Sequence, residues 1–312
     1  MSSTVLLNSS HYQNGVMNYK FNGIQNIQGK EIAVQQLSFY NSFFNVSSVQ
    51  TPSLSVSNTI ILVFPVFTGA NTYVMTEYTL SLPSGFYTYT DFNNAVQNFC
   101  LLNGLYMKDP ATGLNLYFVD ISVNSPVYRI EIDVYYIPTS AQATTLGYTT
   151  GGMVLNTGNL SVAPQVRFVS TSPLSVFGYN TGTYPVSPLT SASATYIDEA
   201  ATEILGQIPP SENQITALTL RCNLVSDGMS YPTDLLCQAP ISAQFGAIDS
   251  FAPSIACYMP IVDGIYANFQ IVFSDQNQNQ IIPLDPEITI ALNIRDRAKK
   301  NEPHNAYFSE RN

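Results

Sequence analysis

The chain has 312 residues, of which only 10% are charged, and its formal net charge is −10 with a pI near 4.4. This length allows one large or two ordinary domains with a substantial core. The first 294 residues carry six basic and 18 acidic groups, which excludes their main surface as a nucleic-acid site because such binding depends on Lys and Arg. Polarity comes instead from Asn, Gln, Ser, Thr and 20 tyrosines. These residues suit pleated surfaces and turns, so the composition predicts an all-β protein.

The N-terminal stretch MSSTVLLNSSHYQNG has neither the charged region nor the apolar region of a signal peptide. The longest apolar run, 60–67, has eight residues, whereas a membrane span needs about 18 or more. We therefore expect no membrane span and synthesis in a reducing cytosol. Residues 1–28 are predicted to form an N-terminal arm.

The stretch GKEIAVQQLSFYNSFFNVSS, residues 29–48, predicts one long, bent β-strand. Apolar residues fall on Ile32 and Val34, slip by one position at 35–36, and resume at Leu37. The phase slips again further along. Because side chains alternate between the faces of a strand, a slip of one residue indicates a β-bulge that bends the strand.

Further strands are predicted from alternating or β-branched runs bounded by turn residues. They are 58–67, 72–82, 114–123, 127–137, 163–170, 215–225, 267–274 and 287–295. The last has the most regular alternation, with isoleucine or leucine at every second position. The strands 114–123 and 127–137 are predicted to form a hairpin, and 275–279 a polar turn.

One helix is predicted with clear end signals, in the stretch TDFNNAVQNFCLLNG at 90–104. Thr90 can cap its first turn, Asp91 complements the positive end of the helix dipole, and Gly104 provides the C-terminal stop. Its apolar residues follow helical spacing. A weaker helical pattern covers 196–205.

Strand-rich stretches at both ends of the chain, with the helix between them, predict a β-sandwich interrupted by an insertion. The sandwich is assigned to 29–82 and 213–297, and a small α+β or β domain to the insertion at 83–212. The remaining residues, 298–312, form a C-terminal tail.

Enzyme signatures are absent from the sequence: it contains no GxSxG, GxxxxGK[ST], GxGxxG or HExxH. The two histidines, His11 and His304, lie near opposite ends of the chain, and a Ser or Cys nucleophile normally needs a positioned base. The cysteines form no CxxC pair and have no histidine beside them, which favours buried free thiols over a zinc site; they are Cys100, Cys222, Cys237 and Cys257. We expect no enzyme activity, no catalytic residues, no cofactor and no metal.

Carboxylate oxygens are the ligands that a hard cation such as calcium prefers. Asp275, Asp285 and Glu287 precede the last strand, but their spacing matches no known loop, and acids in turns commonly accept hydrogen bonds from nearby backbone groups. Glu131 and Asp133 alternate with apolar residues and are predicted to form the solvent face of a half-buried strand. A structural role is favoured for both groups.

Tyrosines in or beside loop-like stretches are the candidate interface residues, because Tyr buries area while its hydroxyl stays polar. A sugar-stacking surface would use the same residue type. The candidates are Tyr135, Tyr136, Tyr148, Tyr179, Tyr184, Tyr258 and Tyr266. Low charge with many uncharged hydrogen-bonding groups suits a subunit that is covered by neighbours.

Several stretches together resemble the penton, or minor capsid, proteins of virophages and polinton-like viruses. The matching segments are KEIAVQQLSFYNSFFNV (30–46), LPSGFYTYTDFNNAVQNFCLLNGLYM (82–107), VFGYNTGTYP (176–185), LRCNLVSDGMSYPTDLL (220–236) and ANFQIVFSDQNQNQIIPLDPEITIALNIRDR (267–297). They occur in the order of the family and span nearly the whole chain. Each is a loose pattern of residue types, so the specificity comes from the series.

The resemblance implies a single jelly-roll β-sandwich in which 29–48 is the long first strand and the helix belongs to an inserted domain. It implies a structural protein that forms homopentamers at the fivefold vertices of an icosahedral virion, after synthesis in the host cytoplasm. The implied partners are further copies of the chain, the double jelly-roll trimers of the major capsid protein, and other minor capsid proteins. The family supplies no catalytic residues.

The alternative is a β-sandwich module that binds a receptor or a carbohydrate through stacked tyrosines. It predicts a shallow aromatic pocket. Nucleic acid is not an expected partner except through the mildly basic tail, 295–312, which holds five basic and three acidic residues. A frayed, solvated terminus is favoured for that tail.

Overall fold

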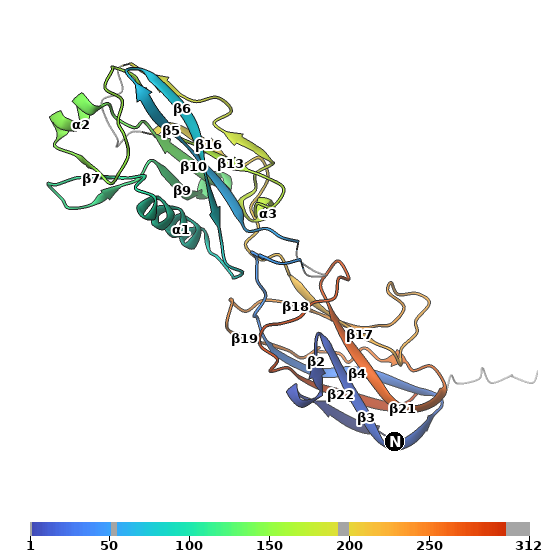
Figure 1. The fold of residues 1–312 in the computed structure, drawn as a ribbon. Helices are drawn as coiled ribbons and strands as arrows, with labels where there is room; N and C mark the ends of the chain where they lie inside the picture. The colour runs from blue at the N-terminus through green and yellow to red at the C-terminus, as the bar shows by residue number, and fades with distance from the viewer. Residues whose placement is uncertain (1, 51–54, 193–199, 298–312) are drawn as a thin grey trace, which may run out of the picture. The chain divides into compact units, whose positions relative to one another are not determined.

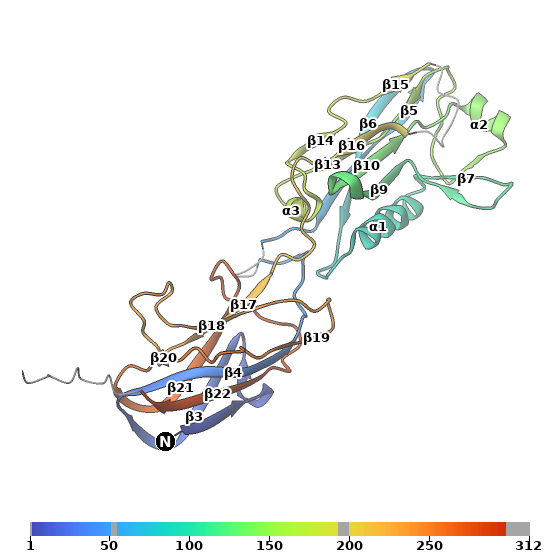
Figure 2. The ribbon, with the colours of Figure 1, turned by 180° about the vertical axis from the view of Figure 1, so that it is seen from behind.

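The computed structural model describes residues 2–50, 55–192 and 200–297 (Figures 1 and 2). The chain divides into two compact units, each with its own core. Unit 1 comprises Met1–Phe43 and Ile215–Asn312, and unit 2 comprises Phe44–Gln214. Unit 2 is thus one continuous stretch inserted into unit 1.

Unit 1 contains two antiparallel sheets, each of which combines blue N-terminal strands with orange to red C-terminal strands in Figure 1. The first has the order β1–β22–β4–β19, with β20 also paired to β4. Its strands are β1 (Ser2–Leu7), β4 (Lys30–Tyr40), β19 (Ile248–Phe251), β20 (Met259–Pro260) and β22 (Thr289–Asp296). Segments at the two ends of the sequence therefore pair directly, with Ser2 opposite Arg295.

The second sheet of unit 1 has the order β18–β17–β21–β3–β2. Its strands are β2 (Tyr12–Gln13), β3 (Val16–Ile27), β17 (Ala217–Cys222), β18 (Leu235–Pro240) and β21 (Gly264–Ser274), and the short 3-10 helix η1 (Ser9–His11) precedes β2. The core between the two sheets includes Phe39, Phe269 and Phe273, all fully buried.

The order of the strands identifies unit 1 as a jelly roll. Leaving aside the two-residue strands β2 and β20, eight strands remain. One sheet holds the first, eighth, third and sixth of them, and the other holds the fifth, fourth, seventh and second. This is two Greek keys wrapped into a sandwich. The prediction of an all-β jelly-roll fold is confirmed.

The bulge predicted from the slip at 35–36 is present. Ala291 pairs with Gln36 and Leu292 pairs with Val34, so Gln35 has no residue opposite it in β22. The strand is shorter than predicted, because β4 ends at Tyr40 and the residues after it leave the sheet. It is also not the first strand of the jelly roll, since β1 and β3 precede it.

Two domain assignments therefore need correction. Residues 1–28 are not an arm: they contain β1 and β3, whose apolar residues Leu7 and Met17 are fully buried in the core of unit 1. Unit 2 begins at Phe44 rather than at 83, so the strands predicted at 58–67 and 72–82 belong to the insertion. Local alternation could not show which core these strands join.

Unit 2 contains several small antiparallel sheets. The sheet β14–β13–β5–β6 is built on the long hairpin of β5 (Thr59–Gly69) and β6 (Thr72–Ser81), and a second sheet has the order β16–β10–β9. Their other strands are β9 (Val119–Asn124), β10 (Arg129–Tyr135), β13 (Gln165–Phe168), β14 (Gly182–Tyr184) and β16 (Ala200–Leu205). Shorter strands are β7 (Met107–Lys108), β8 (Asn115–Leu116), β11 (Thr149–Thr150), β12 (Ser161–Val162) and β15 (Thr190–Ser191).

The helix α1 (Tyr89–Leu102) lies against β9 and buries Phe92, Val96 and Cys100. It begins two residues earlier than predicted: the N-cap is Thr88, not Thr90, and its hydroxyl accepts a hydrogen bond from the Asp91 backbone N–H. The Asp91 carboxylate in turn accepts a hydrogen bond from the Thr88 backbone N–H, which completes a capping box.

The remaining helical elements are short: α2 (Ser140–Leu146), α3 (Leu174–Phe177) and the 3-10 turn η2 (Ser125–Val127), which joins β9 to β10 in the predicted hairpin. The helix predicted at 196–205 was wrong for Ala200–Leu205, which forms β16. Residues 196–199 lie outside the described residues. Pairing with β10 overrides the local helical pattern there.

Candidate assembly surface

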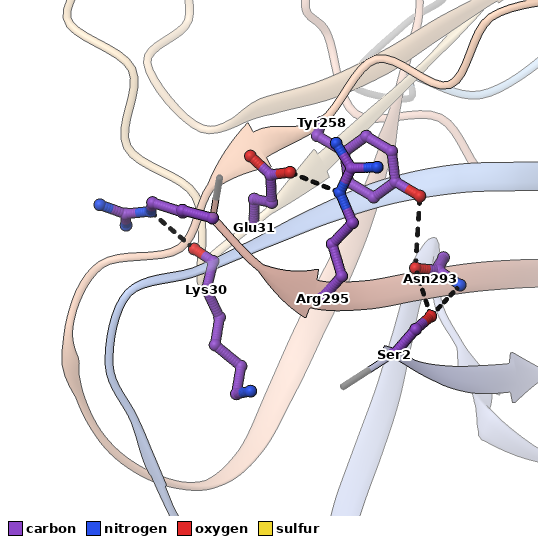
Figure 3. A network of polar contacts seen from close by, with 7 residues as sticks. Ser2, Lys30, Glu31, Tyr258, Asn293 and Arg295 are labelled. Carbon is purple, nitrogen blue, oxygen red and sulfur yellow. Dashed lines mark hydrogen bonds and ion pairs between the residues drawn. The ribbon is translucent and has the colours of Figure 1, made fainter. Parts of the chain in front are cut away.

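A network of polar contacts covers the face of β1, β22 and β4 that points away from the core (Figure 3). The Tyr258 hydroxyl donates to the Asn293 side-chain oxygen at 3.3 Å, and the Ser2 hydroxyl donates to the same oxygen at 3.1 Å. The Asn293 amide in turn donates to Ser2 Oγ at 2.9 Å. Side chains from both ends of the sequence therefore fix one another.

Arg295 links this network to the first residues of β4. Its Nε donates to Glu31 Oε1 at 2.5 Å, and its guanidinium carbon lies 3.3 Å from the centroid of the Tyr258 ring (Figure 3). A guanidinium in this position is attracted by the ring face as well as by the carboxylate. The Glu31 side chain is only 16% exposed, so its partner matters more than in an open surface pair.

Two further basic residues hold the end of the described chain. Lys30 Nζ lies 2.7 Å from Asp296 Oδ1, and this hydrogen bond lowers the pKa of Asp296 to about 2. The Arg297 backbone N–H donates to the Gly29 carbonyl, and its side chain donates to the carbonyls of Lys30 and Ile261. Residues 295–297 are thus an ordered part of the jelly roll, which corrects the prediction of a frayed terminus from residue 295. The rest of the predicted tail, 298–312, lies outside the described residues.

The seven candidate tyrosines are divided between the two units. Tyr258 and Tyr266 belong to unit 1, and the other five belong to unit 2. Tyr266 is half-buried, packs against the core of unit 1, and donates from its hydroxyl to the Val262 carbonyl. The Tyr258 ring is covered by the Arg295 guanidinium, as described above.

Tyr179 is a core residue and not an interface residue. It is 1% exposed, and its hydroxyl donates to the carbonyls of Ile130 and Ile204. The Tyr184 ring packs edge-on against it, with centroids 5.2 Å apart. Tyr135, Tyr136 and Tyr148 are half-buried against the same core. Sequence position beside a loop did not distinguish these rings from exposed ones.

Large exposed side chains elsewhere are better contact candidates, and the following four are not among the seven predicted tyrosines. In unit 1, Met229 is 96% exposed and Tyr231 is 84% exposed, both in the loop between β17 and β18. This loop is held by backbone bonds at Asp227, whose N–H donates to the Thr233 carbonyl. In unit 2, Leu102 and Tyr128 are also exposed. The sequence signal for the exposed loop of unit 1 is the segment SDGMSYPTD, in which Met and Tyr lie between Ser and Pro residues.

One face of the sheet β9–β10–β16 carries four carboxylates. Asp133 lies directly opposite Asp120 on one side and Glu203 on the other, and Glu131 is two residues away on the same face. Burial, followed by these three negative neighbours, raises the pKa of Asp133 to about 7. Its Oδ1 is buried without a hydrogen-bond partner. The predicted alternation of β10 is present, but Asp133 is half-buried rather than fully in solvent.

The acids before the last strand hold turns, as predicted. Asp275 Oδ1 accepts from the backbone N–H groups of Asn277 and Asn279, and Asp285 Oδ1 accepts from that of Glu287. Within the described ranges, no three His, Cys, Asp or Glu side chains are placed to hold a metal ion. Cys100 and Cys222 are buried free thiols, whereas Cys257 is exposed, so the prediction of burial fails there.

Among residues 2–50, 55–192 and 200–297, no helix is both long and apolar enough to cross a membrane.

Comparison with known proteins finds a likeness among solved structures. The chain is similar to the mavirus penton protein, in a crystal structure of its selenomethionine-labelled form, with 9% sequence identity and a TM-score of 0.45. The match covers 94% of this chain and 97% of that one. No family model and no curated protein matches the chain. At this identity and TM-score, the likeness carries no conclusion about function by itself.

Proposed function

We propose that the chain is a structural capsid protein that forms homopentamers at the fivefold vertices of an icosahedral virion. The single observation that carries this proposal is the jelly roll of unit 1 with its insertion after β4. The five sequence segments that resemble virophage penton proteins point in the same direction.

The jelly roll has two distinct ends, which suits a subunit of a closed shell. Ser2 and Asp296 lie at the Lys30 end of β4. Unit 2 is inserted at the other end of the sandwich. The chain leaves unit 1 shortly after Tyr40, which pairs with Ile248, and it returns just before Thr216, whose carbonyl accepts from the Ile241 backbone N–H. A shell subunit needs one end for the interior and one for the exterior. In this proposal the two ends of the unit 1 sandwich take these roles.

The contacts would be made by loops and strand edges of unit 1. Met229 and Tyr231 provide large exposed side chains on a loop fixed by backbone hydrogen bonds, and such residues are frequent anchors of interfaces. Five copies close a ring by a repeated head-to-tail contact. We expect a total buried area of at least about 1,000 Å² per subunit pair. The outer edges of the ring would meet the major capsid trimers and other minor capsid proteins.

Native mass spectrometry of the purified protein, over a range of concentration and salt, tests the proposal. A mass of five chains is expected, and the double variant Met229→Ser/Tyr231→Ser is expected to shift it toward one chain. The matched control is Leu102→Ser on unit 2, which should leave the mass of five chains unchanged. A single chain at every concentration, together with failure to enter capsids when co-expressed with a major capsid protein, would contradict the proposal.

The alternative of a carbohydrate-binding module gains no support from the described cavities. Three cavities in the two units are lined by residues other than the seven candidate tyrosines. A glycan array with the purified chain provides the direct comparison: binding at ordinary concentrations by a monomer would favour the alternative.

A further inference from the structure

Two of the four cysteines line one groove at the edge of the jelly roll. Cys237 belongs to β18, the edge strand of one sheet, and Cys257 lies in the chain between β19 and β20 at the edge of the other sheet. The groove has a volume of about 340 Å³, and Val34 and Leu236 are among its apolar lining residues. Both cysteines are free thiols in the structure.

The Cys237 side chain lies on the core-facing side of its sheet. It is directly opposite Leu220 of β17, and residues directly opposite each other in an antiparallel pair share a face. Leu220 is fully buried in the core of unit 1, and Cys237 packs against the same core. The thiol is only half-buried because β18 is an edge strand.

The Cys257 side chain lies on the core-facing side of the opposite sheet. Met259 pairs with Ile32, which is fully buried in the core, and Tyr258 points to the outer face, where it joins the network of Figure 3. Side chains alternate along an extended chain, so Cys257 returns to the side of Met259. In agreement, Val34, two residues after Ile32, borders the groove together with Cys257. The two thiols therefore face the same opening from opposite sheets.

The two cysteines are near enough to affect each other electrostatically. Burial raises the pKa of Cys237 to about 11, and the neighbouring Cys257 adds to the rise. A disulfide needs Cα atoms roughly 4.4–6.8 Å apart, and β-sandwich domains hold such bonds between their two sheets. Residues 252–258 are not paired with β4. The segment that carries Cys257 can therefore move toward β18 without breaking a hydrogen bond between strands.

We propose that Cys237 and Cys257 are a covalent modification site: in an oxidising environment they form a disulfide across the groove that closes this edge of the jelly roll. In a reducing cytosol the pair stays as thiols. The bond joins the edge strand of one sheet to the chain beside the other sheet, at the point where pairing with β4 is interrupted. This inference concerns unit 1 alone and does not depend on the proposed vertex role.

A small-molecule disulfide such as oxidised glutathione is the oxidant. The thiolate of the exposed Cys257 attacks one of its sulfur atoms, a bond forms between Cys257 and that glutathione, and the other glutathione leaves as a thiolate. Cys237 then loses its proton and attacks Cys257 Sγ, so that the second glutathione leaves. The two protons end on the two glutathione thiols. Two protein thiols are oxidised, and one glutathione disulfide is reduced.

Mass spectrometry of the full-length chain after incubation with oxidised glutathione tests the bond. The expected product has the mass of one chain less two hydrogen atoms, and its digest contains a peptide that links positions 237 and 257. Cys257→Ser should abolish this product. The matched control in the same loop is Ile255→Ser, which should form it to the same extent, because Ile255 is 82% exposed. A glutathione adduct that persists on Cys257, a bond between two chains, or no loss of thiols would each overturn the proposal.

Hydrogen exchange measures whether the bond closes the edge of the sandwich. In the oxidised full-length chain, the amides of 252–258 are expected to exchange on the order of tenfold more slowly than in the reduced chain, because local opening is restricted. Cys257→Ser treated with the same oxidant should show no change. Peptides of β10 in unit 2 report any general unfolding. Equal exchange in the oxidised and reduced chains would overturn the closure.

Discussion

Two sheet faces of this protein are built from the same alternation of apolar and polar residues but differ in electrostatics. On the outer face of the jelly-roll sheet, Arg295 lies opposite Glu31, and opposite charges meet across the strands. On the sheet β9–β10–β16, Asp133 lies opposite Asp120 and Glu203, and like charges meet. Direct cross-strand neighbours stabilise or destabilise a sheet according to the sign of their charges. Register, rather than the alternation itself, therefore decides whether a polar face stabilises its sheet.

The largest expected effect comes from removing the cation on the jelly-roll face. Arg295→Leu leaves the poorly exposed Glu31 carboxylate without its partner and removes the guanidinium from the Tyr258 ring. The free energy of unfolding of unit 1 should fall by about 2 kcal/mol. Urea unfolding followed by pulsed hydrogen exchange in peptides of β4 and β22 measures this. Addition of Glu31→Gln to the variant should recover part of the loss; no recovery would show that the pair is not the cause.

The second effect is a gain in stability and concerns unit 2. Asp133→Asn removes one of four negative charges from the β9–β10–β16 face. At pH 8 it should raise the free energy of unfolding of unit 2 by about 1 kcal/mol, after a discount for the partial exposure of the carboxylate. The same urea experiment on β10 peptides measures it. At pH 4 the substitution should have little effect because Asp133 is already protonated there, and an equal effect at both values of pH would refute the electrostatic explanation.

The stability of the unmodified protein should depend on pH in opposite ways at the two faces. The folded pKa of Asp133 is raised from 3.8 to about 7, so its protonation favours the folded state, and this stability is present below about pH 4 and lost as the pH rises to 7. Asp296 has its pKa lowered to about 2, so its contribution is present above about pH 4 and lost as the pH falls to 2. Urea series between pH 2 and 9, with labelling at one fixed pH, should show the two trends in β10 and β22 peptides. Parallel trends would contradict the contrast between the faces.

The smallest effect is expected at the exposed pair of Lys30 and Asp296. Lys30→Ala should lower the urea midpoint of unit 1 by less than Arg295→Leu does, because exposed ion pairs contribute little to stability. The pKa of Asp296, followed by NMR titration, should rise toward its ordinary value. An unchanged pKa would mean that Lys30 is not the group that lowers it.

Local sequence patterns predicted the elements that depend on neighbouring residues. The bulge at Gln35 follows from a visible slip in alternation, and the last strand, Thr289–Asp296, follows from four alternating apolar residues. The hairpin of β9 and β10 was also predicted, because a turn signal lies between two β-rich runs. In each case the period of the side chains reports directly on the backbone.

Pairing between distant segments could not be predicted in the same way. The partner of Ser2 is Arg295, almost at the other end of the chain, and nothing within six residues of Ser2 indicates this. The N-terminal strands were therefore assigned to an arm. Tyr179 illustrates the same limit for the candidate site: its hydroxyl is satisfied by carbonyls of β10 and β16, and only the folded sheet supplies them.

The insertion of unit 2 as one continuous stretch also affects the order in which the protein can fold. Lys30 and Asp296, which end beside each other, are 266 residues apart in the chain. At about 5–20 residues per second, the ribosome needs on the order of tens of seconds to synthesise that interval. Unit 2 is complete in the nascent chain before β22 is made. Until then β4 lacks β22, the strand with which it pairs along most of its length, and its apolar face is unprotected. Chaperone binding during synthesis should therefore concentrate on residues 2–43.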